Sequence, residues 1–145
     1  MKRIAIAAAL AVAASGAAYA QSGPNLIETR QVGFSLLAGS FGQIRAVSAA
    51  KGDVKTTEGA AKAMGRYAAL IPSLFPAGTQ AGNNTKALPE IWSDSAGFVK
   101  AAAALGAAAA ATAKAANAGD AAGVEAGIKA LGDACGACHR TYRAR

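Results

Sequence analysis

The segment that follows Asp120 carries one apolar stripe, and this stripe limits the fold more than any other feature. Its apolar positions follow one another at intervals of 4, 3, 4, 3 and 4 residues: Val124, Ile128, Leu131, Cys135, Cys138 and Tyr142. That period places them on one face of an α-helix and does not fit a strand. Asp120 is a favourable residue to cap the start of this helix. Such a stripe must be buried, so the sequence predicts packed helices.

Three further segments have helical patterns, and none of the chain has a convincing strand pattern. The first is expected to be capped by Asn25 and has the stripe Phe34, Leu37, Phe41 and Ile44. The second spans about residues 57–72, with the stripe Ala60, Met64, Ala68 and Ile71. The third is expected to run unbroken from Pro89 to Gly119, with an alanine-rich middle that favours a close-packed helix.

The connection between the second and third segments, residues 73–88, is rich in Gly, Pro and Asn and is therefore expected to be a loop. Four amphipathic helices of this kind favour an all-α fold, an antiparallel four-helix bundle.

Residues 1–20 are typical of a secretory signal peptide, with a positive start, an apolar run and small residues before Gln21. Their apolar run is shorter than the roughly 20 residues that a spanning helix needs. Cleavage would leave 125 of the 145 residues, one domain over 21–145, and would lower the net charge from +7 to +5 because Lys2 and Arg3 leave. We expect an exported, periplasmic protein.

The remaining charges are scattered singly, so no nucleic-acid surface is expected. The alanine run at residues 101–111 is too short to cross a membrane, so no membrane span is expected in the mature chain.

The only two cysteines and the only histidine lie together as Cys135-Gly-Ala-Cys138-His139. This Cys-x-x-Cys-His pattern is the attachment signature of one covalent haem c, with the thiols as attachment points and the imidazole as iron ligand. Spacings of three and four put all three groups on one side of the helix.

Three alternatives to covalent haem are weaker. Structural zinc needs four ligands, and the chain has no further Cys or His to complete the set. A thioredoxin-like dithiol is expected beside a βαβ pattern, which is absent. A plain disulfide would not account for the histidine. The sequence therefore favours haem c near the C-terminal helix.

Only six residues follow His139, so a second iron ligand from downstream is not expected. Met64 is the one methionine after residue 20, and it is either a core residue or such a ligand. Without it the iron would be five-coordinate, with one face open to a small molecule or blocked by apolar bulk.

Over essentially all of residues 21–145 the sequence resembles cytochrome c′, the class II bundle cytochromes. The resemblance rests on "RQVGFSLLAGSFGQI" in the first helix, "LPEIWSDSAGF" at the start of the third and "CGACHRTYR" at the end. Six-coordinate relatives carry a methionine in the first helix. This chain has none there, so the resemblance favours the high-spin branch.

The resemblance also implies roles for residues around the haem. Arg30 and Gln31 would lie near the propionates, although an ordinary exposed polar pair is the alternative. Phe34 would block the distal face, although its stripe alone makes it a core residue. Arg143 would lie against the proximal face, or be a helix-end charge. Thr85 would touch the haem edge.

The function that the resemblance implies is binding of NO, and more weakly CO, in the periplasm, with protection against nitrosative stress. A phenylalanine offers bound oxygen no hydrogen bond, which agrees with little oxygen binding. The alternative is an electron carrier with an unknown periplasmic redox partner, six-coordinate through Met64. No acid/base pair accompanies the motif, so no enzyme is expected.

Family members often pair through their first two helices, so a homodimer is compatible with the sequence. Small residues that would allow close approach are Gly39, Gly42, Ala60 and Ala61.

Overall fold

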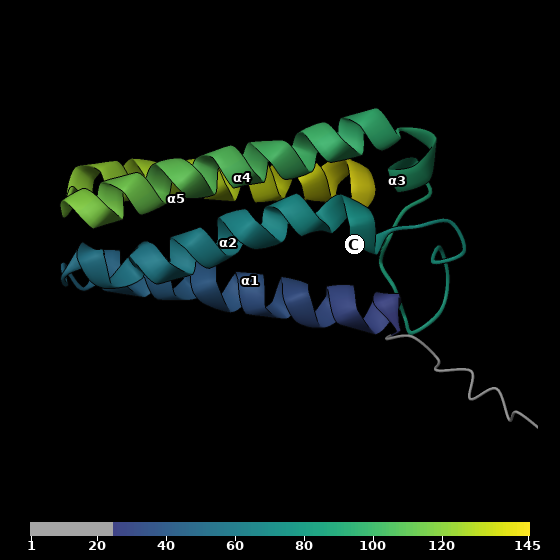
Figure 1. The fold of residues 1–145 in the computed structure, drawn as a ribbon, viewed down its shortest axis with the longest axis horizontal. Coiled ribbons are helices and arrows are strands. Elements are labelled where there is room, and N and C mark those ends of the chain that lie inside the picture. The colour runs from purple at the N-terminus through teal and green to yellow at the C-terminus, as the bar shows by residue number, and fades with distance from the viewer. Residues whose placement is uncertain (1–24) are drawn as a thin grey trace, which may run out of the picture.

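The computed structural model describes residues 25–145, and the proposed signal peptide lies outside the described residues. Four long helices lie side by side as an antiparallel bundle (Figure 1): α1 (Leu26–Ala49), α2 (Glu58–Leu70), α4 (Ser95–Ala118) and α5 (Ala121–Tyr142). Three short helical turns complete the described chain: η1 (Val54–Thr57), η2 (Ile71–Leu74) and α3 (Glu90–Ser93). The predicted all-α four-helix bundle is confirmed.

The ends of the long helices are set by local side chains. The Asn25 side chain accepts hydrogen bonds from the amides of Ile27 and Glu28, at 3.1 and 3.4 Å. The Asp120 carboxylate accepts one from the Gly123 amide at 2.9 Å and caps α5 as expected. Between α4 and α5, Gly119 has φ of +72°, the left-handed conformation that ends a helix and favours glycine.

The third predicted helix is broken, which corrects the expectation of one helix from Pro89 to Gly119. α3 ends at Ser93, and Asp94 leaves the helical conformation with φ −121° and ψ 56°. Its carboxylate accepts hydrogen bonds from the Gly97 amide at 3.1 Å and from the Tyr142 hydroxyl at 2.8 Å. These two bonds favour a cap at Asp94 over continuation of the helix.

The bundle core uses small side chains to bring helices close together. Ile44, Val124 and Leu131 are fully buried, and so are Ala61, Ala109 and Ala116. Each long helix packs against two neighbours, in the order α1, α2, α4, α5 and back to α1. Contact between α1 and α5 is sparse, so the bundle is widest between these two helices.

α4 is long and apolar enough, by length and composition, to cross a membrane, and it is the only such helix among residues 25–145. The length expected for the apolar segment, residues 101–111, is therefore corrected, because the helix extends well beyond the alanine run at both ends. α4 nevertheless packs against both α2 and α5 and buries Phe98 and Leu105. Its apolar composition is that of a core helix in this bundle.

Candidate functional site

A cavity of about 590 Å³ lies in the wide part of the bundle, between α1 and α5. Its walls are formed by α1, α2, α4, α5 and the loop at residues 85–87, and most of them are apolar. All eight residues that the sequence singled out line this one cavity: Arg30, Gln31, Phe34, Thr85, Cys135, Cys138, His139 and Arg143. The volume falls in the range of roughly 300–1,000 Å³ that is typical of cofactor pockets.

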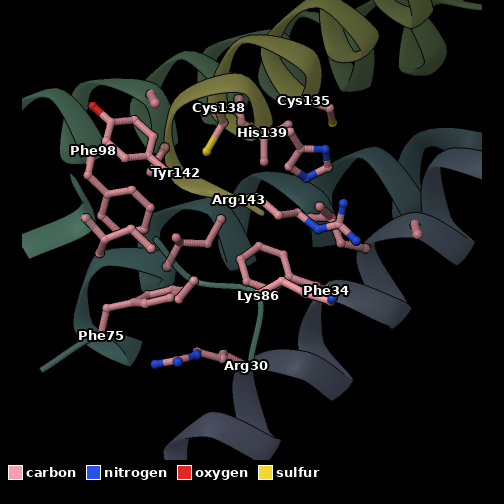
Figure 2. Close-up of a pocket in the computed structure, with 18 of the residues that line it drawn as sticks. Arg30, Phe34, Phe75, Lys86, Phe98, Cys135, Cys138, His139, Tyr142 and Arg143 are labelled. Atoms are coloured by element: carbon pink, nitrogen blue, oxygen red, sulfur yellow. The ribbon is translucent and has the colours of Figure 1, made fainter. Parts of the chain in front are cut away.

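The Cys-x-x-Cys-His motif lies on the α5 wall. Figure 2 shows Cys138 and His139 on α5 at one side of the cavity, with Phe34 and Arg30 on α1 at the other. Both cysteines are half-buried and reduced, and burial raises the pKa of each thiol above its ordinary value. The thiols therefore remain protonated at neutral pH.

His139 faces the same space from the last turns of α5. Burial, and secondarily the charge of Arg143, lowers the pKa of its imidazole. The imidazole is therefore neutral at pH 7, which is the form that binds a metal.

Aromatic side chains form the opposite wall. The Phe34 ring packs edge-on against Tyr67, at 5.5 Å between centroids, and is tilted against Phe75, at 6.4 Å. Phe75 continues to Phe98 at 5.0 Å, and Phe98 to Tyr142 at 5.2 Å. This chain of rings joins α1 to α5 around the cavity.

Gly33 allows the Tyr67 ring to approach the backbone of α1 closely. A Cβ atom at this position would lie well inside van der Waals contact of the Tyr67 ring. The absence of a side chain lets Tyr67 cross α1 and donate its hydroxyl to the Arg30 carbonyl at 3.0 Å.

Arg30 is buried, with only 2% of its surface exposed, so it is not an exposed polar residue. One terminal nitrogen donates to the Leu74 carbonyl at 3.3 Å and to Thr79 Oγ1 at 3.0 Å. The other donates to the Thr79 carbonyl at 2.8 Å and to Thr85 Oγ1 at 2.9 Å. The guanidinium also lies 4.2 Å from the centre of the Phe75 ring. Arg30 thereby holds the 74–85 segment against α1.

Within residues 25–145, the Arg30 charge has no carboxylate partner. Among the described residues the ion pairs are Lys62 with Glu58 and Lys129 with Asp133, both on other faces. Burial lowers the pKa of Arg30, but an arginine remains charged at neutral pH. The cavity therefore has a buried positive charge in its wall.

Polar residues gather at one edge of the cavity. Gln31 donates to the Asn83 carbonyl at 2.8 Å, while Lys86 and Arg143 also line this edge. An isolated antiparallel bridge joins Ala87 to Arg143, with Ala144 N donating to the Lys86 carbonyl at 2.8 Å. The loop is therefore fastened to the end of α5.

Sequence reasoning missed several residues of this site. Tyr67, Phe75, Thr79 and the Asp94–Tyr142 hydrogen bond all shape its walls. The residues that they contact lie far away along the chain, so no local sequence pattern predicts these contacts. The aromatic residues of "SLFPAG" and "GRYAAL" were the only available signal.

The arrangement fits haem. Two thiols and a neutral imidazole share one wall, where they can attach the porphyrin and bind its iron. The aromatic side chains across the cavity suit the planar, apolar porphyrin ring, and the buried positive charge of Arg30 suits its propionate carboxylates. Among the described residues no cluster of three or more His, Cys, Asp or Glu side chains could hold a bare metal ion. The fold and site define a four-helix-bundle c-type haem protein.

Comparison with known proteins specifies the family. The family described as Cytochrome C′ matches residues 25–143. Cytochrome c′ of Rubrivivax gelatinosus is 34% identical over 119 residues, which cover 81% of this chain and 92% of that protein. The chain belongs to the cytochrome c′ family, whose cofactor is covalently bound haem c.

Solved structures agree with this membership. A cytochrome c′ described as having an unusual ligand-controlled dimer dissociation matches with a TM-score of 0.77 and 29% identity, over 83% of this chain and 95% of that one. A nitric oxide complex of a variant of cytochrome c prime from Alcaligenes xylosoxidans matches with a TM-score of 0.74 and 30% identity, over 83% and 94%.

Proposed function

We propose that this protein is a periplasmic five-coordinate haem protein that binds NO and CO, and that its role is to sequester NO under nitrosative stress. The observation that carries the proposal is the placement of His139 on one wall of the cavity and of the apolar Phe34 ring on the wall across from it. The nitric oxide complex of the Alcaligenes xylosoxidans relative supports the choice of gas.

The residues of α5 hold the cofactor in this proposal. Cys135 and Cys138 would hold haem through thioether links, each formed by addition of the S–H across one vinyl group, and the neutral imidazole of His139 would bind its iron. When bound, haem supplies an iron atom that takes a diatomic gas and can exchange one electron. Arg143 lies beside His139 and would provide a positive charge on the same side of the cofactor.

The remaining wall residues orient the cofactor and limit access. Phe34 blocks the distal face with an apolar ring. Arg30 favours the propionates through its charge, because its four terminal N–H bonds are already donated to protein oxygens. Gln31 and Thr85 lie at the haem periphery. Gln31 is held there by its hydrogen bond to the loop, and Thr85 by its hydrogen bond from Arg30.

Export to the periplasm fits this role, with residues 1–20 as a cleaved signal peptide and 21–145 as the mature domain. The role is that of a binding protein and not of an enzyme, and no nucleic-acid partner is proposed.

Electron transfer is the second candidate, and Met64 favours it. Its side chain is only 1% exposed and lines the cavity from α2. Among the described residues, its sulfur is the one thioether that could serve as a sixth iron ligand. The chain would then pass electrons to a periplasmic redox partner.

A homodimer through α1 and α2 is also proposed, supported by the dimer of the related structure. Gly39 and Gly42 face open space and allow close approach. Ala61 does not, because it is fully buried in the core.

Visible spectroscopy of the purified haem protein tests the proposal. High-spin ferric and ferrous spectra, with NO and CO binding to the ferrous form, are expected. A low-spin ferrous spectrum that Met64→Leu converts to high spin would instead establish the electron carrier. Absence of a haem band would overturn both.

A further inference from the structure

The chain leaves the helical conformation directly after α5. Arg143 is extended, with φ −132° and ψ 126°, and it pairs with Ala87 of the loop in an isolated antiparallel bridge. Two backbone hydrogen bonds flank this pair: the Leu88 amide donates to the Tyr142 carbonyl at 3.1 Å, and the Ala144 amide donates to the Lys86 carbonyl at 2.8 Å. We call this arrangement the C-terminal bridge.

Both strands of the C-terminal bridge are held by other parts of the fold. Tyr142 donates its hydroxyl to Asp94, at the start of α4, at 2.8 Å. In the loop, Thr85 accepts a hydrogen bond from buried Arg30 at 2.9 Å, so the loop is tied to α1 just before the bridge begins. The backbone of Arg143 is therefore fixed, although only two residues follow it.

The C-terminal bridge determines where the Arg143 side chain lies. The two flanking hydrogen bonds make Ala87 and Arg143 a non-hydrogen-bonded pair, in which the opposed side chains lie close together on one face. Both residues line the haem cavity. The small Ala87 side chain leaves room for the guanidinium, and Figure 2 shows Arg143 on the same side of the cavity as His139.

The charge of Arg143 acts on its surroundings at this position. Burial is the larger cause of the lowered pKa of His139, and the charge of Arg143 is the second. In the part of the chain that the structure describes, the two ion pairs are formed by other cations, Lys62 and Lys129. A positive charge disfavours further positive charge nearby, and ferric iron carries one unit more than ferrous iron. An arginine held beside the iron ligand therefore favours the ferrous state.

We propose that the C-terminal bridge is a positioning device, which holds the Arg143 charge beside His139 and thereby biases the haem iron toward the ferrous state. Ala144 is its positioning residue, through the amide that it donates to Lys86. The inference rests on the proposed function, in which His139 binds the iron and ferrous haem takes the gas. It adds a reason why the form that binds NO and CO is favoured.

Ala144→Pro in the haem-loaded protein removes the donor of the bridge, because proline has no amide hydrogen. The extended backbone of Arg143 suits a residue that precedes proline, so the helices should be undisturbed. Ala144→Gly is the matched control, since it keeps both the amide hydrogen and the net charge of the protein.

Spectroelectrochemical titration measures the midpoint potential of each variant. In Arg143→Gln the equilibrium constant for reduction should fall about tenfold, which is about 59 mV for a one-electron couple. Ala144→Pro should lower this constant by about threefold, because the charge remains in the chain but is no longer held beside the iron. Ala144→Gly should keep the wild-type potential.

A double-mutant cycle separates positioning from a general structural effect. If the bridge acts through Arg143, Ala144→Pro should not lower the potential further in the Arg143→Gln background. An equal drop in both backgrounds, or an unchanged potential in either single variant, would overturn the inference. So would a drop in Ala144→Gly as large as that in Ala144→Pro. These measurements need only bound haem, so a protein that binds haem but neither NO nor CO would contradict the proposed function, and the potentials would still decide on the bridge.

Discussion

Arg30 shows how one side chain connects the fold to the site. Its guanidinium makes four hydrogen bonds to Leu74, Thr79 and Thr85. A buried charge is costly unless it is satisfied, and here the loop oxygens satisfy it. The bonds in turn fix a Gly- and Pro-rich loop that has little structure of its own. The loop and the arginine are therefore ordered together.

Arg30→Met should lower the free energy of unfolding by at least about 3 kcal/mol, because several loop acceptors lose a charged donor worth about 1.5–3 kcal/mol each. Urea unfolding followed by circular dichroism measures this loss. Arg45→Met is the control, since Arg45 lies on the same helix but is exposed and only faces the Phe41 ring, at 5.8 Å. Equal losses of stability in both variants would mean that the hydrogen bonds from Arg30 to the loop do not stabilise the fold.

Phe34 decides how easily a gas reaches the distal face. If its ring must be pushed aside at a cost of about 1–3 kcal/mol, the usual scale for overpacking, then Phe34→Ala should raise CO affinity about tenfold to a hundredfold. The gain should come mainly from faster association, measured by stopped-flow mixing. An unchanged association rate together with a large loss of stability would make Phe34 an ordinary core residue.

At the scale of elements, the break between α3 and α4 places a residue that links the start of α4 to the end of α5. Asp94 caps α4 and accepts the Tyr142 hydroxyl at 2.8 Å. The hydrogen bond to this carboxylate, followed by burial, raises the pKa of Tyr142 from 10.0 to about 12. Burial raises the pKa of Tyr67 to about 12 as well.

These shifts predict an alkaline loss of stability. The folded state keeps both phenol protons between pH 10 and 12, whereas the unfolded chain releases them. Their contribution is therefore complete below pH 10 and is lost as the pH rises to about 12. Urea unfolding at intervals over this range should show a falling free energy. Tyr142→Phe and Tyr67→Phe should each make the fall shallower, and an unaltered slope in both would contradict the assignment.

The sequence predicted elements whose information is local. The α5 stripe, the Asp120 cap and the Cys-x-x-Cys-His spacing all lie within a few residues of one another, so periodicity and cap chemistry suffice. The clamp of Arg30 on Thr85 spans 55 positions, and the Asp94–Tyr142 bond spans 48. Only tertiary packing creates these contacts. The same reason explains why the break at Asp94 was not predicted.

At the scale of the whole molecule, the cofactor and the bundle depend on each other. An unfilled cavity costs about 24 cal/mol per Å³ if it remains dry and unrelaxed. For 590 Å³ that is on the order of 14 kcal/mol, which matches the entire stability of a typical domain, about 5–15 kcal/mol. Entering water or partial collapse would lower the cost, but either would loosen the bundle.

Cys135→Ala combined with Cys138→Ala should therefore give a poorly folded product with weak helical signal and a broad melting transition. Circular dichroism and thermal melting measure both. His139→Ala is the control, because it removes the proposed iron ligand and leaves both attachment points, so it should keep haem and most of the fold. A fully helical double variant with an unchanged melting point would show that the bundle stands without its cofactor.

The close approach of Tyr67 to Gly33 has a consequence for how the family varies. No side chain fits at position 33 while the tyrosine ring lies across α1. A relative that gains even a methyl group there must therefore lose or redirect the aromatic ring at the position of Tyr67. The two sites are expected to change together across related sequences, although 34 positions separate them.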